Sequence, residues 1–329
     1  APAREPAREP AVNPNQDYVL DYQIFPLRNK RWGKLPPPIE RLIRRSSSSS
    51  SSPPSSSSSN IQLLRHGIEN HPQQSFLSCL ADLYGSSSWK EMKQVMVNAF
   101  TLDKFLQYQN GSLVASFKKN ASASAAASEA EAISTEKYQN TLFYRSLDLN
   151  EPVEYDFLME TLVAYENFLD YLQDDSIWID YEYLWDFLST PDPLLFPKGL
   201  NLLILTMEKN EDEQIHLTCP SRVSSNMGLY DPAKPSWVLI QRPLLSGSPY
   251  FEPIYLVNQN KYIPIHRAKY VKTFDAAALQ QYFPFISSLD ADSCRPTERK
   301  GKPTVSAAFV YEQCTNKGFQ INKQIVNPA

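Results

Sequence analysis

Ser75 is the residue whose type and position come nearest to a catalytic nucleophile. It follows a polar loop, residues 70–74, and opens the segment SFLSCLADLY, whose apolar residues recur at helical spacing. The positive end of a helix dipole stabilises a developing anion, so nucleophiles are often placed at helix N-termini. A serine there still needs a neighbouring base. The alternative, an ordinary serine capping a helix, is at least as well supported.

The histidines do not supply that base by their spacing. Two of them flank the polar loop, one alternates within a strand pattern, and one lies in a basic loop. Cys79 follows Ser75 by one helical turn, and we expect it to be a buried structural cysteine. No catalytic residue is therefore predicted. The four histidines are His66, His71, His216 and His266.

Metal and cofactor motifs are missing from the sequence. The cysteines form no C-x-x-C pair, the histidines form no H-x-x-x-H pair, and there is no glycine-rich phosphate loop. We expect no metal and no cofactor. The cysteines are far apart in the chain, which favours free, mostly buried thiols.

A short apolar segment near the N-terminus has the residue types of a docking site. Tyr18, Phe25 and Trp32 lie between two low-complexity stretches, an A-R-E-P repeat and a serine run. Two arginines, Arg44 and Arg45, end the segment. We expect residues 17–45 to bind another chain through these five side chains, because aromatic anchors on a flexible arm can dock on a neighbour at little folding cost.

The chain divides into three parts by composition. Residues 1–60, rich in proline and serine, are predicted to form an extended docking arm, because such a stretch cannot bury enough apolar surface to fold. Residues 61–290 carry the periodic apolar patterns of a folded core, and 291–329 form a polar tail with one strand candidate at 305–311.

The elements of the core predict an α+β fold, with N-terminal helices followed by a mostly antiparallel sheet. Helices are expected at 75–84, 88–100, 154–172 and 274–283, with Ser88 and Glu91 in a capping box. The alanine-rich stretch 121–134 is an exposed helix or an excursion. Helix 154–172 should cover a single sheet. Its strands are predicted at 202–207, 215–219, 237–241, 251–257 and 261–265.

This order of elements resembles that of papain-like deubiquitinating proteases of the ovarian-tumour type. The resemblance places Ser75 where that family has its cysteine, and Tyr250 or Phe251 where it has its histidine. At neither position does this chain have the catalytic residue type of that family. The resemblance therefore implies a degenerate protease-like fold with Ser75 at a degenerate active-site position.

Charge is unevenly distributed along the chain. The net charge is −4, which argues against a bulk nucleic-acid binder. Residues 151–190 hold eleven acids and no lysine or arginine, whereas residues 1–45 hold nine cations and five acids. Outside that arm, a basic patch occurs at 267–272. No apolar run is long enough to cross a membrane.

Six sequence segments stand out by their composition and order along the chain. They are RHGIENHPQQSFLSCLADLY (65–84), YEYLWDFL (181–188), LLFPKGLNLLIL (194–205), CPSR (219–222), YDPAKPSWVLIQ (230–241) and YFEPIYLV (250–257). Together these phrases resemble a conserved virion protein family of the nucleocytoplasmic large DNA viruses. Two labels go with that resemblance, minor capsid protein and large subunit of the viral early transcription factor.

The resemblance implies a non-enzymatic structural protein of the virion, a minor capsid or scaffold component that contacts other virion proteins through its arm. The alternatives are a binding module like the early transcription factor and an active papain-like hydrolase. The second of these ranks lowest, because no base can be assigned.

Overall fold

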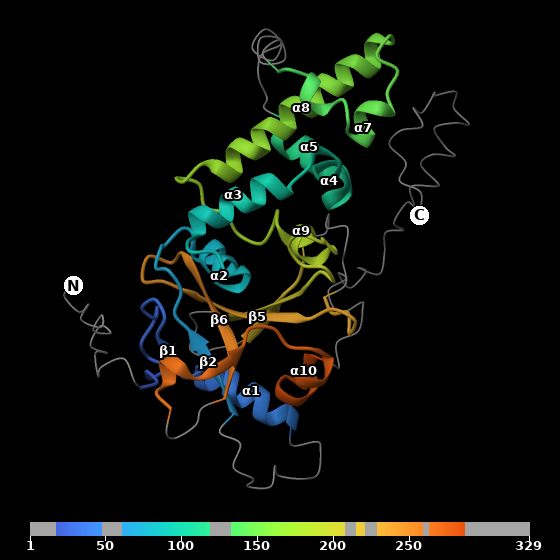
Figure 1. The fold of residues 1–329 in the computed structure, drawn as a ribbon. Helices are drawn as coiled ribbons and strands as arrows, with labels where there is room; N and C mark the ends of the chain where they lie inside the picture. Colours follow the sequence, from blue (N-terminus) through green and yellow to red (C-terminus); the bar gives the residue numbers. More distant parts are fainter. Residues whose placement is uncertain are drawn as a thin grey trace, which may run out of the picture.

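The computed structural model describes residues 18–47, 61–118, 133–207, 215–220, 229–258 and 263–286. The fold is α+β, as the sequence predicts (Figure 1). The predicted strand at 305–311, the tail 291–329, the A-R-E-P repeat, the serine run and most of the alanine-rich stretch lie outside the described residues. Among the described residues no helix combines the length and apolarity needed to span a membrane.

The strands form one mixed sheet in the order β1-β2-β6-β5-β3-β4, and β7 also pairs with β6. The β3–β5 pair is parallel and the other described pairs are antiparallel. Two strands, β1 and β2, precede α2 and the later helices instead of following them. The strands are β1 Trp32–Gly33, β2 Ile61–His66, β3 Asn201–Met207, β4 Ile215–Thr218, β5 Ser236–Pro243, β6 Pro249–Asn258 and β7 Lys269–Val271.

The helices separate into two groups in space. One group lies against the sheet, and the other, comprising α3, α4, α5, α7 and α8, forms a helical layer at the far end of the molecule (Figure 1). Short 3-10 turns occur at 108–111, 136–138 and 265–267. The helices are α1 Pro37–Ser47, α2 Ser75–Tyr84, α3 Trp89–Ala99, α4 Leu102–Gln107, α5 Ser112–Phe117, α7 Leu142–Arg145, α8 Pro152–Gln173, α9 Trp185–Ser189 and α10 Ala276–Tyr282.

The prediction that helix 154–172 covers the sheet is wrong. This helix, α8, packs on α3, α4 and α5, while α2 packs on β6 and α9 packs on β3. Its Phe168 ring lies 4.7 to 5.3 Å from the rings of Phe100, Phe105 and Phe117. The apolar stripe thus finds aromatic side chains of the preceding helices, which the strand pattern did not reveal.

The predicted hairpin partner at 261–265 is also wrong. The strand that follows β6 in the chain and pairs with it is β7, and residues 265–267 form a 3-10 turn. Pro264 precedes that turn; its ring fixes φ and it has no N–H to donate to a ladder. Ser88 caps α3 as expected, and Asp275 caps α10.

The described part of the predicted arm, residues 18–47, is not separate from the core. Residues 18–47 are part of the folded unit, and Leu27, Leu35 and Ile39 are buried in it. A buried ion pair holds this segment. Arg65 Nη1 lies 2.5 Å from Glu252 Oε2, and both side chains are fully buried.

Backbone groups of the N-terminal segment complete the buried pair. Glu252 Oε1 accepts the N–H of Leu27 at 2.7 Å, and Arg65 Nε donates to the carbonyl of Lys34 at 2.8 Å. A charge in the interior needs such partners, because burial removes its hydration. We name residues 18–35 with these bonds the N-terminal strap. The predicted boundary at residue 60 therefore does not separate two folding units.

Candidate functional site

Ser75 lies where the sequence predicts it, at the first turn of α2 and beside β6. Its side chain is fully buried, and its Oγ accepts the backbone N–H of Phe251 at 3.3 Å. The neighbouring Tyr250 hydroxyl donates to Asn70 Oδ1 at 3.4 Å. Gln74 occupies the cap position without a side-chain cap bond, so Ser75 is not the N-cap residue. The hydroxyl at the protease-like position is thus used in holding the helix to the strand.

The second nucleophile candidate, Cys79, is a free thiol in the interior. Burial, together with the nearby charges of Asp82 and Glu252, raises its pKa well above the ordinary value. A thiol with a raised pKa is protonated and therefore a poor nucleophile. Cys219 is disulfide-bonded. The expectation of free thiols therefore holds for Cys79 and is wrong for Cys219.

The histidines are distributed over separate parts of the fold. His71 Nδ1 accepts the N–H of Gln73, and His216 is on β4, at the opposite edge of the sheet from β2. The contacts described for Ser75 and Cys79 include no histidine. Within the described part of the chain, no group of three or more His, Cys, Asp or Glu side chains is placed to hold a metal ion.

His66 instead belongs to a polar cluster with Asp82 and Tyr255. His66 Nδ1 is 3.6 Å from Asp82 Oδ2, the Tyr255 hydroxyl donates to the same carboxyl oxygen, and Lys272 Nζ is 3.7 Å from it. Burial would raise the pKa of Asp82, but these hydrogen bonds and charges outweigh it and lower that pKa. The cluster ties α2 to β2, β6 and the end of β7.

Two of the three predicted aromatic anchors are occupied by the chain's own core. Trp32 is 4 % exposed, and its ring lies 4.5 Å from His66 and 5.1 Å from Tyr270. Phe25 packs edge-on against Tyr250 at 5.7 Å. Their role as anchors for another chain is therefore corrected: the strap that carries them is part of this fold.

The remaining predicted partner residues are exposed, or their side chains lie outside the described residues. Tyr18 is 54 % exposed, with the Arg31 guanidinium 5.1 Å from its ring. Arg44 is exposed on α1, 3.9 Å from Glu40. The side chain of Arg45 lies outside the described residues.

The strap and the 263–272 loop are both rich in lysine and arginine and lie next to each other in the fold. The contact of Trp32 with Tyr270 joins them, and Ile265 and Ala268 share a small apolar cluster with Trp32. The two stretches, 18–44 and 263–272, together hold nine lysines and arginines and two acids. We name the exposed residues of these two stretches, 18–44 and 263–272, the basic face. In the sequence its two halves are more than two hundred residues apart, so neither looks like a continuous patch.

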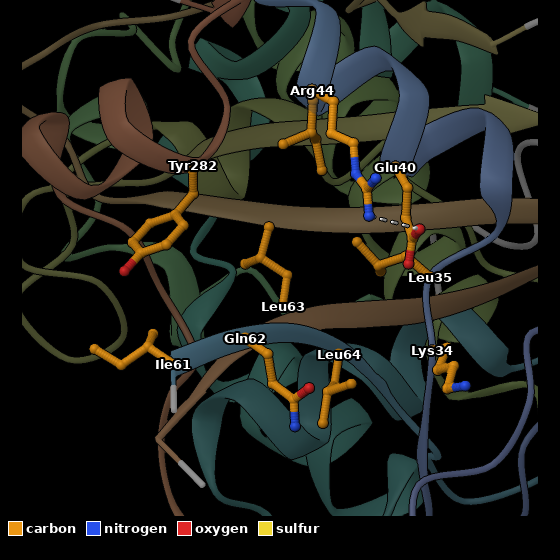
Figure 2. A pocket seen from close by; sticks show the side chains of 10 residues that line it. Lys34, Leu35, Glu40, Arg44, Ile61, Gln62, Leu63, Leu64 and Tyr282 are labelled. Atoms are coloured by element: carbon orange, nitrogen blue, oxygen red, sulfur yellow. Dashed lines mark ion pairs between the residues drawn. The ribbon is translucent and has the colours of Figure 1, made fainter. Parts of the chain in front are cut away.

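An open groove lies at the edge of this basic face, between α1, β2 and α10 (Figure 2). Its volume is about 520 Å³. Apolar side chains from α1 and β2 line its floor, and charged side chains stand at one side, where Figure 2 shows Arg44 directed toward Glu40. We name it the basic groove. It is lined by Lys34, Leu35, Glu40, Ile43, Arg44, Ile61, Gln62, Leu63, Leu64 and Tyr282.

Sequence reasoning missed this groove, because its walls come from segments near residues 34–44, 61–64 and 282. The available signal was weak: α1 has an apolar side and a basic side, which the sequence presents as the tail of a linker. Comparison with known proteins adds no assignment, since no protein-family model, curated protein or solved structure matches the chain.

Proposed function

We propose that this chain is a non-enzymatic structural component of a virion, a minor capsid or internal scaffold protein that binds other virion proteins. The observation that carries the non-enzymatic part is the position of Ser75. Its hydroxyl is buried and accepts the Phe251 N–H at 3.3 Å, in the place where the protease-like order of elements puts a nucleophile. The virion part rests on the resemblance of the phrases between residues 65 and 257.

The binding part of the proposal is supported by the surface. The basic groove is a surface hollow whose floor is apolar and whose rim is charged. A groove with an apolar centre and a polar rim is the usual anatomy of a protein-docking surface. Of the strap's three predicted aromatic anchors only Tyr18 stays exposed, so we assign the docking role mainly to the groove.

The experiment is a comparison of purified particles and purified protein. Mass spectrometry of the particles should detect the chain at a constant ratio to the major capsid protein. Serine- and cysteine-directed probes, a fluorophosphonate and a ubiquitin vinyl sulfone, should leave Ser75 and Cys79 of the folded chain unlabelled. Absence from particles overturns the virion assignment, and labelling that Ser75→Ala or Cys79→Ala abolishes revives a hydrolase.

A second candidate is a nucleic-acid-binding module of the early-transcription-factor kind, and the basic face favours it. Its two stretches hold nine cations and two acids, the charge that phosphate contacts need, with Lys272 paired to Asp82 and Arg44 to Glu40. Binding of duplex DNA or single-stranded RNA should then weaken steeply with salt, by a logarithmic slope of roughly 0.7 to 0.9 per phosphate contact. A chain that binds neither at low salt excludes this candidate.

A further inference from the structure

The helical layer ends in a tip that is both acidic and apolar. Leu142 on α7 is 75 % exposed and Val153 at the start of α8 is 69 % exposed, with Tyr155 also on the surface. Between and beside them are four carboxylates and a single cation, Arg145. We name residues 142–156 the acidic tip. Its carboxylates are Asp148, Glu151, Glu154 and Asp156.

The acidic tip is held in a fixed shape. The Asp103 carboxylate accepts the N–H groups of Leu142 and Phe143 at 3.1 and 3.0 Å, and the Phe143 ring lies 5.6 Å from that of Phe157. A surface that is ordered before binding loses little conformational entropy when it docks. Exposed apolar side chains in a rigid, charged setting are typical of an interaction site.

The basic groove has the complementary composition. Ile61 is partly exposed on its apolar floor. The rim has a net positive charge, with Lys34 and Arg44 against Glu40, and 83 % of the Arg44 side chain is exposed. An apolar side chain flanked by carboxylates matches this arrangement in both hydrophobicity and sign of charge.

The two surfaces lie at opposite ends of the molecule, α7 and the start of α8 at one end and α1 at the other (Figure 1). One copy cannot bring its own tip to its own groove across the sheet. A contact between the tip of one copy and the groove of another joins two different patches, and such a contact repeats into a ring or an open chain.

We propose that the acidic tip of one copy docks in the basic groove of the next, so that the chain assembles head to tail. The occupant of the groove is thus a second copy of this protein, presenting Leu142 or Val153 to the floor and carboxylates to Lys34 and Arg44. This inference rests on the proposed function of an assembly component and names its partner. Association should be stronger in about 0.1 M salt than in about 1 M salt, because the Debye length falls from roughly 10 Å to roughly 3 Å.

The test is a charge swap on the full chain, followed by sedimentation velocity. One variant carries Lys34→Glu and Arg44→Glu, and the other carries Glu151→Lys and Asp156→Lys. Each alone presents like charges on tip and groove, so we expect self-association to weaken at least about tenfold. Mixed in equal amounts, the tip of either variant matches the groove of the other, and assembly should return.

Matched control variants carry the same changes in net charge at positions outside the acidic tip and the basic groove. Lys198→Glu with Lys269→Glu is the control for the groove variant, and Asp170→Lys with Glu182→Lys is the control for the tip variant. All four positions are exposed and lie outside the tip and the groove. The controls should associate like the unmodified chain, and circular dichroism should show every variant folded.

The outcomes separate this inference from the proposed function. A chain that stays monomeric at high concentration in low salt, or a mixture that does not recover assembly, overturns the head-to-tail contact even when the protein is present in particles. Self-association that persists in the groove variant overturns it as well, as does a basic groove that binds oligonucleotide while the chain remains monomeric. A protein absent from particles that still assembles by charge swap removes the virion role alone.

Discussion

At the scale of single residues, the buried Arg65–Glu252 pair is the group on which most of the N-terminal strap depends. Each partner is fully buried, and their remaining hydrogen-bonding capacity is used by backbone groups of residues 24–34. Such a pair is a weak source of net stability, but the loss of one partner leaves an uncompensated charge in the interior.

Glu252→Gln should therefore lower the free energy of unfolding by about 3–5 kcal/mol, because Arg65 keeps its charge and loses its counter-ion. Urea denaturation of the purified chain measures this. Glu40→Gln is the matched control, since Glu40 and Arg44 form an exposed pair that should contribute less than about 1 kcal/mol. Equal effects of the two substitutions would contradict the role given to the buried pair.

The Asp82 cluster makes a prediction about acid stability. The pKa of Asp82 is lowered in the folded state by His66, Tyr255 and Lys272, despite its burial. A carboxyl group with a lowered folded pKa adds stability above its unfolded pKa of about 3.9, and this stability is lost as the pH falls through the folded pKa. We expect Asp82→Asn to destabilise the chain at pH 7 and to make stability fall less steeply below about pH 4. Denaturation midpoints across pH 2 to 7 measure the slope; an unchanged slope would contradict the prediction.

At the scale of elements, α8 has one side that holds the helical layer together and another that is solvated. Leu162 is fully buried, and α8 packs on α3, α4 and α5. Leu162→Asp should destabilise the fold by about 4 kcal/mol or more, since it places an unpaired carboxylate in an apolar interior. Leu245→Asp is the control, because Leu245 is almost entirely exposed. Thermal unfolding compares the two, and a folded Leu162→Asp protein with an unchanged melting temperature would argue against the packing described.

The acidic side chains of α8 form more hydrogen bonds and ion pairs than their composition indicates. Glu166 accepts hydrogen bonds from Lys137 and from the hydroxyl of the buried Tyr138, and Glu160 pairs with Lys118 at 2.9 Å. The sequence predicts a small effect of Glu166→Lys, as for a solvated charge. The structure leads to a different expectation, a loss of about 1–2 kcal/mol, because the Tyr138 hydroxyl loses its acceptor.

Asp170→Lys serves as the comparison, since Asp170 is exposed on the same helix. Its expected effect on stability is below about 0.5 kcal/mol. If denaturant unfolding finds the two variants equally stable, the bonds of Glu166 contribute nothing to the fold.

At the scale of the whole molecule, the N-terminal strap and the sheet form one folding unit. A chain beginning at Ile61 lacks β1, α1 and the backbone partners of Arg65 and Glu252. We expect it to be insoluble or to lose its cooperative unfolding transition, whereas a chain beginning at Tyr18 keeps the strap and its contacts. Solubility and the cooperativity of urea unfolding distinguish the two. A stable, cooperative chain from residue 61 onward would restore the boundary that composition suggests.

Charge is also separated at this scale. The helical layer, as described in residues 89–118 and 133–173, holds ten carboxylates and six cations, whereas the basic face holds nine cations and two acids. This polarity does not follow from the net charge of −4, which averages over both ends. It is the reason why a head-to-tail contact between copies is electrostatically favourable.

Local patterns in the sequence determined much of this protein. The spacing of Phe76, Leu77 and Leu80 placed α2, the box around Ser88 placed the start of α3, and the apolar runs placed β3, β5 and β6. These features depend on helix and strand periodicity and on capping, which act over a few neighbouring residues.

Only the tertiary structure decided which surfaces meet. Apolar periodicity tells that α8 must bury Leu162, but it does not tell whether a sheet or other helices cover it. Composition also does not show that Arg65 and Glu252, 187 residues apart, bind the strap. Nor does it show that the stretches 18–44 and 263–272, which form the basic face, are neighbours. The physical reason is that burial of an apolar side chain is favourable against any apolar partner, and a buried charge is satisfied by any suitable polar partner. Which partner is chosen depends on the close packing of the whole chain.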